Sequence, residues 1–180
     1  WAMLLARCPS RSFTIVGDRA QARHGFREIW EERLARIGLP KVEVAQLTIN
    51  YRTPEEVMRE AAPVILEALP DANVPVSVRS SGLPVVYGGV ADLQGVLDAW
   101  LDEHLDGIAC VITAVGSDRS LAYDNRGRVR SLTPETAKGL EFDLVVLIDP
   151  DRFGTGIEGA VDRYVAMTRA TQQLVVLTTE

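Results

Sequence analysis

The stretch from Thr133 to Asp149, TPETAKGLEFDLVVLID, carries the clearest structural signal in this 180-residue chain. It opens with polar and turn-forming residues and closes with the apolar run Leu144 to Ile148, which has the length of a buried strand. Gly139 precedes this run at a point where a residue without a Cβ permits unusual dihedrals and close backbone approach. An uninterrupted apolar strand is typical of a parallel sheet that is covered on both faces.

The same pattern continues on both sides of this stretch. Apolar or β-rich runs predict strands, and apolar residues at helical spacing predict helices between them. The predicted strands are residues 12–16, 42–47, 74–78, 84–87, 108–115, 129–132, 144–148 and 174–178, and the predicted helices are residues 26–39, 53–69, 91–105 and 157–170. This alternation predicts an α/β fold of three layers, in which a parallel sheet carries helices on both faces.

The tripeptide Asn50-Tyr51-Arg52 is expected between a strand and a helix. Thr53 is placed to cap that helix, Pro54 suits its first turn, and Glu56 would complete a capping box. An arginine in such a connection can pair with phosphate oxygens through two N–H groups, and a tyrosine ring can stack on adenine. Without further context, a solvated loop arginine is the simpler interpretation.

Composition indicates a globular chain, because hydrophobic residues make up 47% and charged residues 24%. No signal peptide and no apolar run of membrane-spanning length is present. Cys8 and Cys110 both lie among apolar residues, which predicts reduced thiols and a cytoplasmic location. The net charge of -6 argues against a free-standing nucleic-acid-binding protein, which usually has a basic face. The chain opens at Trp1 in an apolar, helix-like segment, and we interpret it as a fragment of a longer protein.

Two further stretches carry groups that suit phosphate chemistry. Gly17-Asp18-Arg19-Ala20-Gln21 follows a predicted strand, and the Gln21 amide can hydrogen-bond a γ-phosphate or an attacking water. Ala166-Met167-Thr168-Arg169-Ala170 is predicted to lie on the helix of residues 157–170. Taken alone, the first stretch is a common turn and the second is an exposed helix arginine.

Together, four stretches in this order resemble motifs III to VI of superfamily 1 DNA helicases of the UvrD/Rep type. They are residues 17–21, residues 50–52, the segment Lys138-Gly-Leu-Glu-Phe-Asp143, and residues 166–170. The resemblance implies a RecA-like (P-loop NTPase-like) motor fold. It implies a C-terminal remnant of a first motor lobe in residues 1–39 and a second RecA-like lobe in residues 40–180.

The resemblance also implies roles for single residues. Expected in catalysis are Arg169 as an arginine finger, Arg52 and Gln21; expected to contact nucleotide are Tyr51, Gly139 and Glu141; expected to contact nucleic acid are Thr133 and Phe26. No residue is expected to bind a metal ion. His24 and Phe26 fall where the family has two aromatic residues near the strand-binding groove. Phe26 can stack a base, but its helical spacing favours a place in the core.

The chain contains no G-x-x-x-x-G-K-[ST] phosphate loop and no Asp-Glu pair at the end of an apolar strand. ATP and Mg²⁺ are therefore expected as cofactors that the N-terminal motor lobe of the same protein mainly binds. The sequence predicts the C-terminal motor domain of an ATP-dependent DNA helicase or translocase, an ATP hydrolase when full-length. The fragment alone is predicted to be inactive.

Two alternatives remain. Glu135 stands where most relatives carry His. Only about 80 residues separate Arg52 from Thr133, which leaves no room for the large extra subdomain that UvrD and Rep proteins insert there. Both features resemble the HelD branch, ATPases that bind and recycle RNA polymerase. RNA polymerase would then be a partner in addition to, or in place of, DNA.

The other alternative is a dinucleotide-binding oxidoreductase. Gly154-Thr-Gly-Ile-Glu-Gly159 matches G-x-G-x-x-G, precedes a predicted helix and has Glu180 about 20 residues further on. However, five residues separate it from Ile148, whereas the fingerprint needs the turn directly at the strand end.

Overall fold

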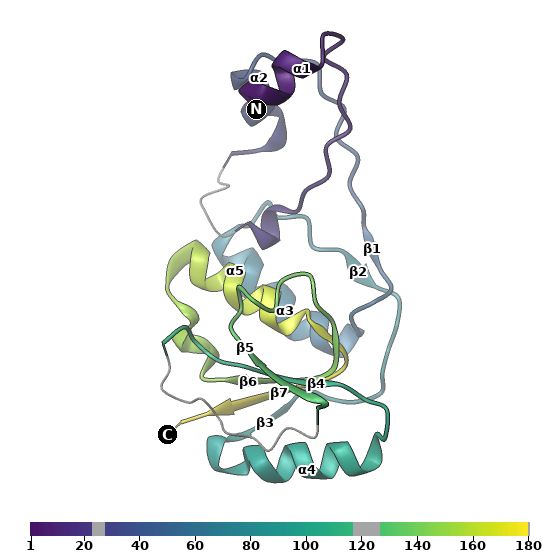
Figure 1. Ribbon diagram of the computed structural model, residues 1–180, viewed down its shortest axis with the longest axis vertical. Coiled ribbons are helices and arrows are strands. Elements are labelled where there is room, and N and C mark those ends of the chain that lie inside the picture. Colours follow the sequence, from purple (N-terminus) through teal and green to yellow (C-terminus); the bar gives the residue numbers. More distant parts are fainter. Residues whose placement is uncertain (23–27, 117–126, 180) are drawn as a thin grey trace.

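The computed structural model describes residues 1–22, 28–116 and 127–179. Within these residues, the centre of the protein is a five-stranded parallel sheet in the order β3-β7-β6-β4-β5. Its strands are β3 (Val86–Gly89), β4 (Ala109–Ile112), β5 (Val129–Leu132), β6 (Phe142–Ile148) and β7 (Ala170–Thr178). Helices cover both faces of the sheet (Figure 1), which confirms the predicted three-layer α/β fold.

The helices and a small second sheet complete the described part of the chain. The α-helices are α1 (Ala2–Arg7), α2 (Trp30–Arg36), α3 (Glu55–Ala68), α4 (Leu93–Glu103) and α5 (Gly156–Met167), and the 3-10 helices are η1 (Arg19–Gln21), η2 (Val90–Asp92) and η3 (Pro150–Phe153). The small sheet consists of β1 (Ile49–Asn50), which pairs in parallel with β2 (Val76–Ser77).

The side chains of β6 show how the sheet acquires two buried faces. Val145 and Leu147 pack with α3 and α5, whereas Leu144, Val146 and Ile148 pack with α4. Successive residues of a strand point to opposite faces, so a strand that is apolar at every position must be covered on both sides. This is why the run Leu144 to Ile148 predicted its surroundings correctly.

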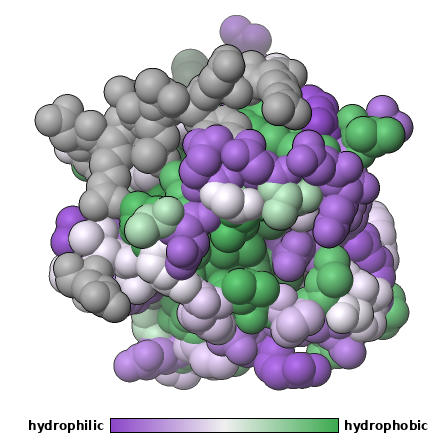
Figure 2. All heavy atoms as spheres, turned by 90° about the horizontal axis from the view of Figure 1, so that it is seen from below, coloured by the Kyte–Doolittle hydropathy of each residue, from purple (hydrophilic) through white to green (hydrophobic). Residues whose placement is uncertain are grey.

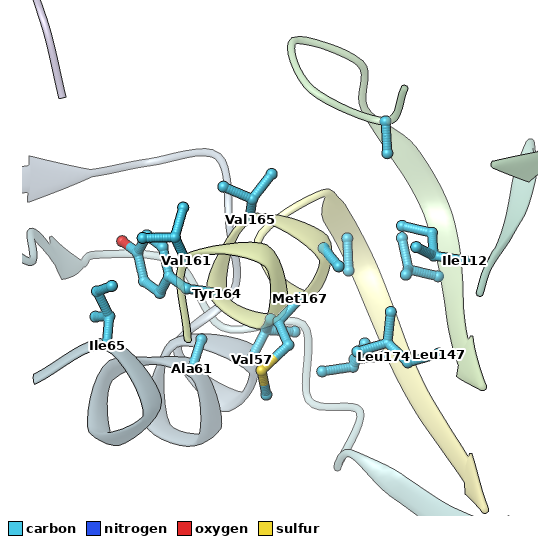
Figure 3. Packing of buried hydrophobic residues seen from close by; sticks show 14 of the residues in the cluster. Val57, Ala61, Ile65, Ile112, Leu147, Val161, Tyr164, Val165, Met167 and Leu174 are labelled. Carbon is cyan, nitrogen blue, oxygen red and sulfur yellow. The ribbon is translucent and has the colours of Figure 1, made fainter. Parts of the chain in front are cut away.

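Helix α5 is the most enclosed helix among those described. It packs against the sheet on one side and against α3 on another. There Ala61 and Ile65 lie near Val161 and Tyr164, and Val57 lies near Met167 (Figure 3). A helix that is apolar around most of its circumference belongs in a protein interior. Its C-terminal end is therefore held firmly at the start of β7.

The opposite face of the sheet is covered by α4. Its buried residues Leu93, Leu97, Trp100 and Leu101 fall on one side of the helix because they are spaced four, three and one positions apart. From this side the surface is largely hydrophilic around a small apolar centre (Figure 2). The α4 face is thus an ordinary solvated helix surface.

Arg128 closes the C-terminal end of α4. Its Nη1 donates to the carbonyl oxygen of His104 at 2.6 Å, and its Nη2 donates to that of Leu101 at 3.1 Å. The last carbonyls of a helix have no partner within the helix, so a side chain that satisfies them stabilises its end.

The N-terminal elements α1 and α2 lie away from the sheet (Figure 1). The 3-10 helix η1 instead lies against α5, where Ala20 is 1% exposed and belongs to the core. The division of the chain at residues 39 and 40 stays a prediction.

Two of the predicted strands are wrong. Residues 12–16 and 42–47 have no regular secondary structure, and Val16 and Leu47 are 90% and 81% exposed. A β-rich composition makes a strand only where a neighbouring strand supplies hydrogen bonds and side-chain contacts. Pairing begins two residues after the second segment, at Ile49. Of the predicted helix at residues 26–39, residues 28–39 are described, and only those of α2 are helical, so the prediction is too long at its C-terminal end.

The predicted capping box is also wrong. Pro54 is the N-cap of α3, and no side chain caps the helix. Thr53 is fully buried and its hydroxyl instead donates to the carbonyl oxygen of Thr168 at 3.4 Å. The predicted helix of residues 157–170 ends at Met167, so Arg169 lies in the connection to β7 rather than on the helix.

Gly159 tests the packing at the start of α5. A Cβ at this position would overlap the backbone carbonyl of Gly154, which cannot swing away as a side chain can. We expect Gly159→Ala to destabilise the protein by about 1–3 kcal/mol. Chemical denaturation followed by circular dichroism measures this change.

Gly95 is the matched control. It lies in α4, is exposed, and has open space on the side where the Cβ of an alanine would stand. Gly95→Ala should therefore raise stability by about 0.5–1 kcal/mol, because alanine loses less backbone entropy in a helix. Equal effects of the two substitutions would contradict the packing described for Gly159.

Candidate functional site

The loop that follows β1 is shaped by one asparagine side chain. Asn50 Oδ1 accepts the backbone N–H of Arg52 at 2.9 Å and that of Thr53 at 3.1 Å. Asparagine commonly closes a turn in this way. The turn gives the Arg52 side chain a defined direction.

Arg52 meets Glu141, which lies 89 positions away in the chain. Arg52 Nη1 is 3.0 Å from Glu141 Oε1, and the two side chains are 37% and 49% exposed. Arg52 Nε is withdrawn from solvent and has no hydrogen-bond partner among the described residues. Arg52 therefore presents a half-exposed guanidinium whose donors are only partly used.

Glu141 directly follows the turn that runs from Thr133 to Leu140. Gly139 has φ +78° and open space around its Cα, so a side chain would fit but the backbone would be strained. Thr133 and Thr136 hold the start of this turn, with their hydroxyl oxygens 3.0 Å apart and Thr133 N donating to Thr136 Oγ1 at 2.9 Å. Thr133 is thus an anchor of the turn that leads to Glu141.

Arg169 is almost fully buried, with 2% of its surface exposed. Its Nε donates to Val165 O at 3.0 Å, its Nη1 to Leu140 O at 3.3 Å and its Nη2 to Thr168 Oγ1 at 3.4 Å. Burial lowers the pKa of the Arg169 guanidinium and the nearby charge of Arg52 lowers it further, while Glu141 opposes both. The charge of Asp18 also opposes the lowering of this pKa, so the two arginines, Glu141 and Asp18 form one electrostatic group.

Gln21 approaches the same region from η1, which lies against α5. Asp18 holds η1 in shape, because its carboxylate accepts Ala20 N at 2.8 Å and Gln21 Nε2 at 2.7 Å. Burial raises the pKa of Tyr164 to about 12, and the charge of Asp18 raises it as well. Asp18 therefore lies within electrostatic reach of α5, beside the group that contains Arg169.

The remaining predicted residues are less constrained. Tyr51 is 79% exposed, so its ring is available on the surface next to Arg52. Phe26, with His24, lies outside the described residues. The structure thus brings Arg52, Glu141 and Arg169 together, with Asp18 and Gln21 close by.

Sequence reasoning missed Arg79, Ser77 and Tyr164. Arg79 contacts the loop of Arg52, Ser77 donates to the carbonyl oxygen of Thr53 at 2.6 Å, and Tyr164 lies within electrostatic reach of both Asp18 and Arg169. No local motif marks these residues. The one available signal was the place of Arg79 between two short predicted strands. An arginine that is half-buried there needs carbonyl groups as hydrogen-bond partners.

Within residues 1–22, 28–116 and 127–179, no cluster of three or more His, Cys, Asp or Glu side chains could hold a metal ion. The described part of the chain also contains no helix that is both long and apolar enough to cross a membrane.

Comparison with known proteins supports the fold. The structure is similar to the C-terminal domain of a possible DNA helicase from Lactobacillus plantarum WCFS1, with a TM-score of 0.53 and 18% identity over 72% of this chain and 88% of that one. The fold resembles that of a helicase C-terminal domain. The PRRSV nsp10 helicase also matches, with a TM-score of 0.40 and 17% identity over 74% of this chain. This chain spans only 24% of the length of nsp10. No protein-family model and no curated protein matches the sequence.

Glu56, in the first turn of α3, holds the loop that follows Arg79. Its carboxylate accepts the hydroxyl of Ser80 and the backbone N–H groups of Ser81 at 3.2 Å and Gly82 at 2.9 Å. The hydrogen bond from Ser80 is the main cause that lowers the pKa of Glu56 from 4.5 to about 2. The charged carboxylate thus fixes the turn that follows Arg79.

This pKa predicts how acid affects stability. Because the folded-state pKa of Glu56 is depressed, its contribution is present above about pH 4.5 and is lost as the pH falls towards about 2. Glu56→Gln should therefore be less stable than the wild type at neutral pH, and the difference should disappear towards pH 2. Urea denaturation across a pH series measures it. Glu67→Gln, at an exposed position near the other end of α3, controls for the loss of one negative charge. A difference that does not change with pH would contradict the role of the Glu56 carboxylate.

Proposed function

We propose that this chain is the C-terminal motor domain of an ATP-dependent DNA helicase or translocase. The observation that carries the proposal is the meeting of Arg52, Glu141 and Arg169. Arg52 pairs with Glu141, and Arg169 donates to the carbonyl oxygen of Leu140, the residue before Glu141. Arg52 pairs with Glu141 and has further N–H donors, and the guanidinium of Arg169 lies in the same region, so two guanidinium groups can donate to a phosphate there. The likeness to a helicase C-terminal domain supports the same conclusion at the level of the fold.

Arg52 is the group best prepared to bind phosphate oxygens. Its side chain is 37% exposed, and Glu141 engages only one of its two Nη atoms. A guanidinium can donate two parallel hydrogen bonds to a phosphate. The residues present therefore fit the anionic end of ATP, which would supply the phosphoryl group that is transferred to water.

Arg169 is proposed to act as an arginine finger after a change of partners. Its Nη1 and Nη2 now make long contacts to Leu140 O and Thr168 Oγ1, at 3.3 and 3.4 Å. To act on a phosphate, these two nitrogens must exchange those acceptors for phosphate oxygens, while Nε can keep its bond to Val165 O. A cationic group at that point stabilises the negative charge that develops during phosphoryl transfer.

The other roles follow from position. The Gln21 amide would orient the attacking water, Tyr51 would stack on the adenine ring, and Gly139 would let the backbone before Glu141 approach the nucleotide. The phosphate cradle and the Mg²⁺ ligands are assigned to the N-terminal motor lobe, because the sequence has no G-x-x-x-x-G-K-[ST] loop. Thr133 would contact the backbone of the nucleic acid.

A second function is an ATPase that acts on RNA polymerase. Two observations favour it. The exposed carboxylate of Glu135 follows Thr133, and a negative charge there repels a phosphate backbone. The described residues between Arg52 and Thr133 belong to α3, α4 and strands of this same domain, with no additional subdomain among them. Stimulation of ATP hydrolysis by single-stranded DNA favours the first function, and co-elution with RNA polymerase favours the second.

The structure does not meet the geometric condition for a dinucleotide-binding site. Strand β6 ends at Ile148, and η3 (Pro150–Phe153) separates it from Gly154. A dinucleotide fingerprint requires the glycine turn directly between strand and helix. We therefore do not propose an oxidoreductase.

The arginine roles predict a specific kinetic result in the intact protein that contains this chain. Arg169→Ala should lower kcat by about 10³-fold or more, and Arg52→Ala should lower it by at least about tenfold, because both act on charge that develops in the transition state. The KM for ATP should change much less in both variants. Steady-state ATPase assays with and without single-stranded DNA measure these values.

Arg59→Ala is the control for these two variants. Arg59 lies on α3 with its side chain 71% exposed, and its loss removes one positive charge without touching the site. Circular dichroism should accompany the assay, because Arg169→Ala also removes donors from buried carbonyl groups. Normal turnover in folded Arg52→Ala and Arg169→Ala proteins would show that the proposed roles are wrong.

Glu135 predicts a change in DNA binding. Replacing Glu135 with His should tighten the binding of single-stranded DNA by the intact protein, because a repulsive charge leaves the turn that begins at Thr133. Fluorescence anisotropy with a labelled oligonucleotide across a salt series measures the change. Glu103→Gln removes another exposed carboxylate on α4, on the other face of the sheet, and should have little effect. Equal responses of the two variants would mean that DNA does not pass near Glu135.

A further inference from the structure

Arg79 joins two backbone segments that lie far apart in the sequence. Its Nη1 donates to the carbonyl oxygen of Arg52 at 3.1 Å, 27 positions away, and its Nη2 donates to that of Thr171, 92 positions away. Arg52 and Thr171 flank the candidate site, because Thr171 follows Arg169 by two residues. One guanidinium therefore ties the loop of Arg52 to the strand that begins just after Arg169.

The backbone of Arg79 is itself anchored to the same loop. Its carbonyl oxygen accepts the N–H of Glu55 at 2.8 Å, and its own N–H donates to Ser77 Oγ at 3.2 Å. The Ser77 hydroxyl in turn donates to the carbonyl oxygen of Thr53 at 2.6 Å. The carbonyl groups of residues 52 and 53 are thus both held from the segment that runs from Ser77 to Arg79.

Few other hydrogen bonds or ion pairs among the described residues link the loop of Arg52 directly to the segment of Arg169 or to Glu141. The hydroxyl of Thr53 reaches Thr168 O only at 3.4 Å, and the ion pair of Arg52 with Glu141 is partly exposed and screened by solvent. Two carbonyl bonds from a half-buried, always charged guanidinium are stronger than either contact. The packing of α3 on α5 places the loop as a whole, and Arg79 adds the strongest bonds from the carbonyl group of Arg52 itself to the strand that follows Arg169.

We propose that Arg79 is a positioning residue that sets the place of Arg52 beside Arg169 and thereby determines the rate of phosphoryl transfer. This inference rests on the proposed function. Arg79 does not touch the phosphate; it acts through the backbone of Arg52. An arginine is needed because its planar guanidinium offers two terminal nitrogens to two carbonyl groups at once, whereas a lysine side chain offers one nitrogen.

The test is a double-mutant cycle in the intact protein, with ATPase activity and thermal stability measured for every variant. Arg79→Ala should lower kcat by about tenfold to a hundredfold, since small displacements of a catalytic group cost rates of this order. The KM for ATP should change little, because binding depends mainly on other groups. Arg79→Lys, which keeps the charge but not the fork, should also lower kcat.

The decisive variant combines Arg79→Ala with Arg52→Ala. If Arg79 acts through Arg52, its loss should lower kcat by less than about twofold once Arg52 is absent, because the two effects are then not additive. The effect of Arg79→Ala on thermal stability should persist in this background. A merely structural role would lower stability in both backgrounds and would not produce this kinetic pattern.

Arg128→Ala is the matched control. Arg128 also donates from both Nη atoms to two carbonyl oxygens, but it does so at the end of α4 on the other face of the sheet. It should lower stability and leave kcat unchanged. Arg79→Ala and Arg128→Ala proteins with the same kcat would overturn the inference.

The failure of the inference can be told apart from that of the proposed function. Two results, each with a low kcat for Arg52→Ala, overturn the inference alone. One is a normal kcat for Arg79→Ala. The other is a double variant in which the losses of the two single variants multiply. A normal kcat for Arg52→Ala overturns the proposed role of Arg52 and the inference with it. If Arg79→Ala does not fold, Arg79→Lys takes its place in the cycle, and a full kcat in that variant counts against the inference.

Discussion

Arg169 carries a positive charge that is almost fully withdrawn from solvent, and a buried charge is tolerated only where hydrogen bonds replace the lost water. Its acceptors come from α5, from the connection after α5, and from the turn before β6. These three segments can satisfy the guanidinium only if they meet at one point. The end of α5, the start of β7 and the approach to Glu141 are therefore arranged around a single side chain.

The rest of the domain keeps that point in place. Helix α5 is enclosed by the sheet and by α3, so its C-terminal end has little freedom (Figure 3). The loop of Arg52 reaches the same point from β1, through the asparagine turn at Asn50 and the guanidinium of Arg79. Helix α4 covers the far face of the sheet and contributes only to the core. The candidate site is thus built on one face, while the other face supplies stability.

The sequence predicted those parts of the fold that depend on burial. The apolar runs of β4, β6 and β7 are strands because both faces of the sheet need apolar residues. It failed at residues 12–16 and 42–47, which pair with no strand in the described part of the chain. It also failed at Thr53 and Glu56, whose side chains satisfy distant groups instead of the helix end. The meeting of Arg52, Glu141 and Arg169 was expected only from the family resemblance. Arg79 was not expected at all, because its carbonyl partners are adjacent only in the folded chain.

Glu141 already occupies one donor of Arg52, so any anion that approaches this arginine competes with a carboxylate held in place by the fold. A singly charged anion gains about as much from Arg52 as Glu141 does, and it also loses its water and its freedom of movement. A polyphosphate carries several charges and can engage both arginines together. If the site binds ATP as proposed, the carboxylate of Glu141 would favour a ligand with several negative charges over the small anions of the surrounding solution.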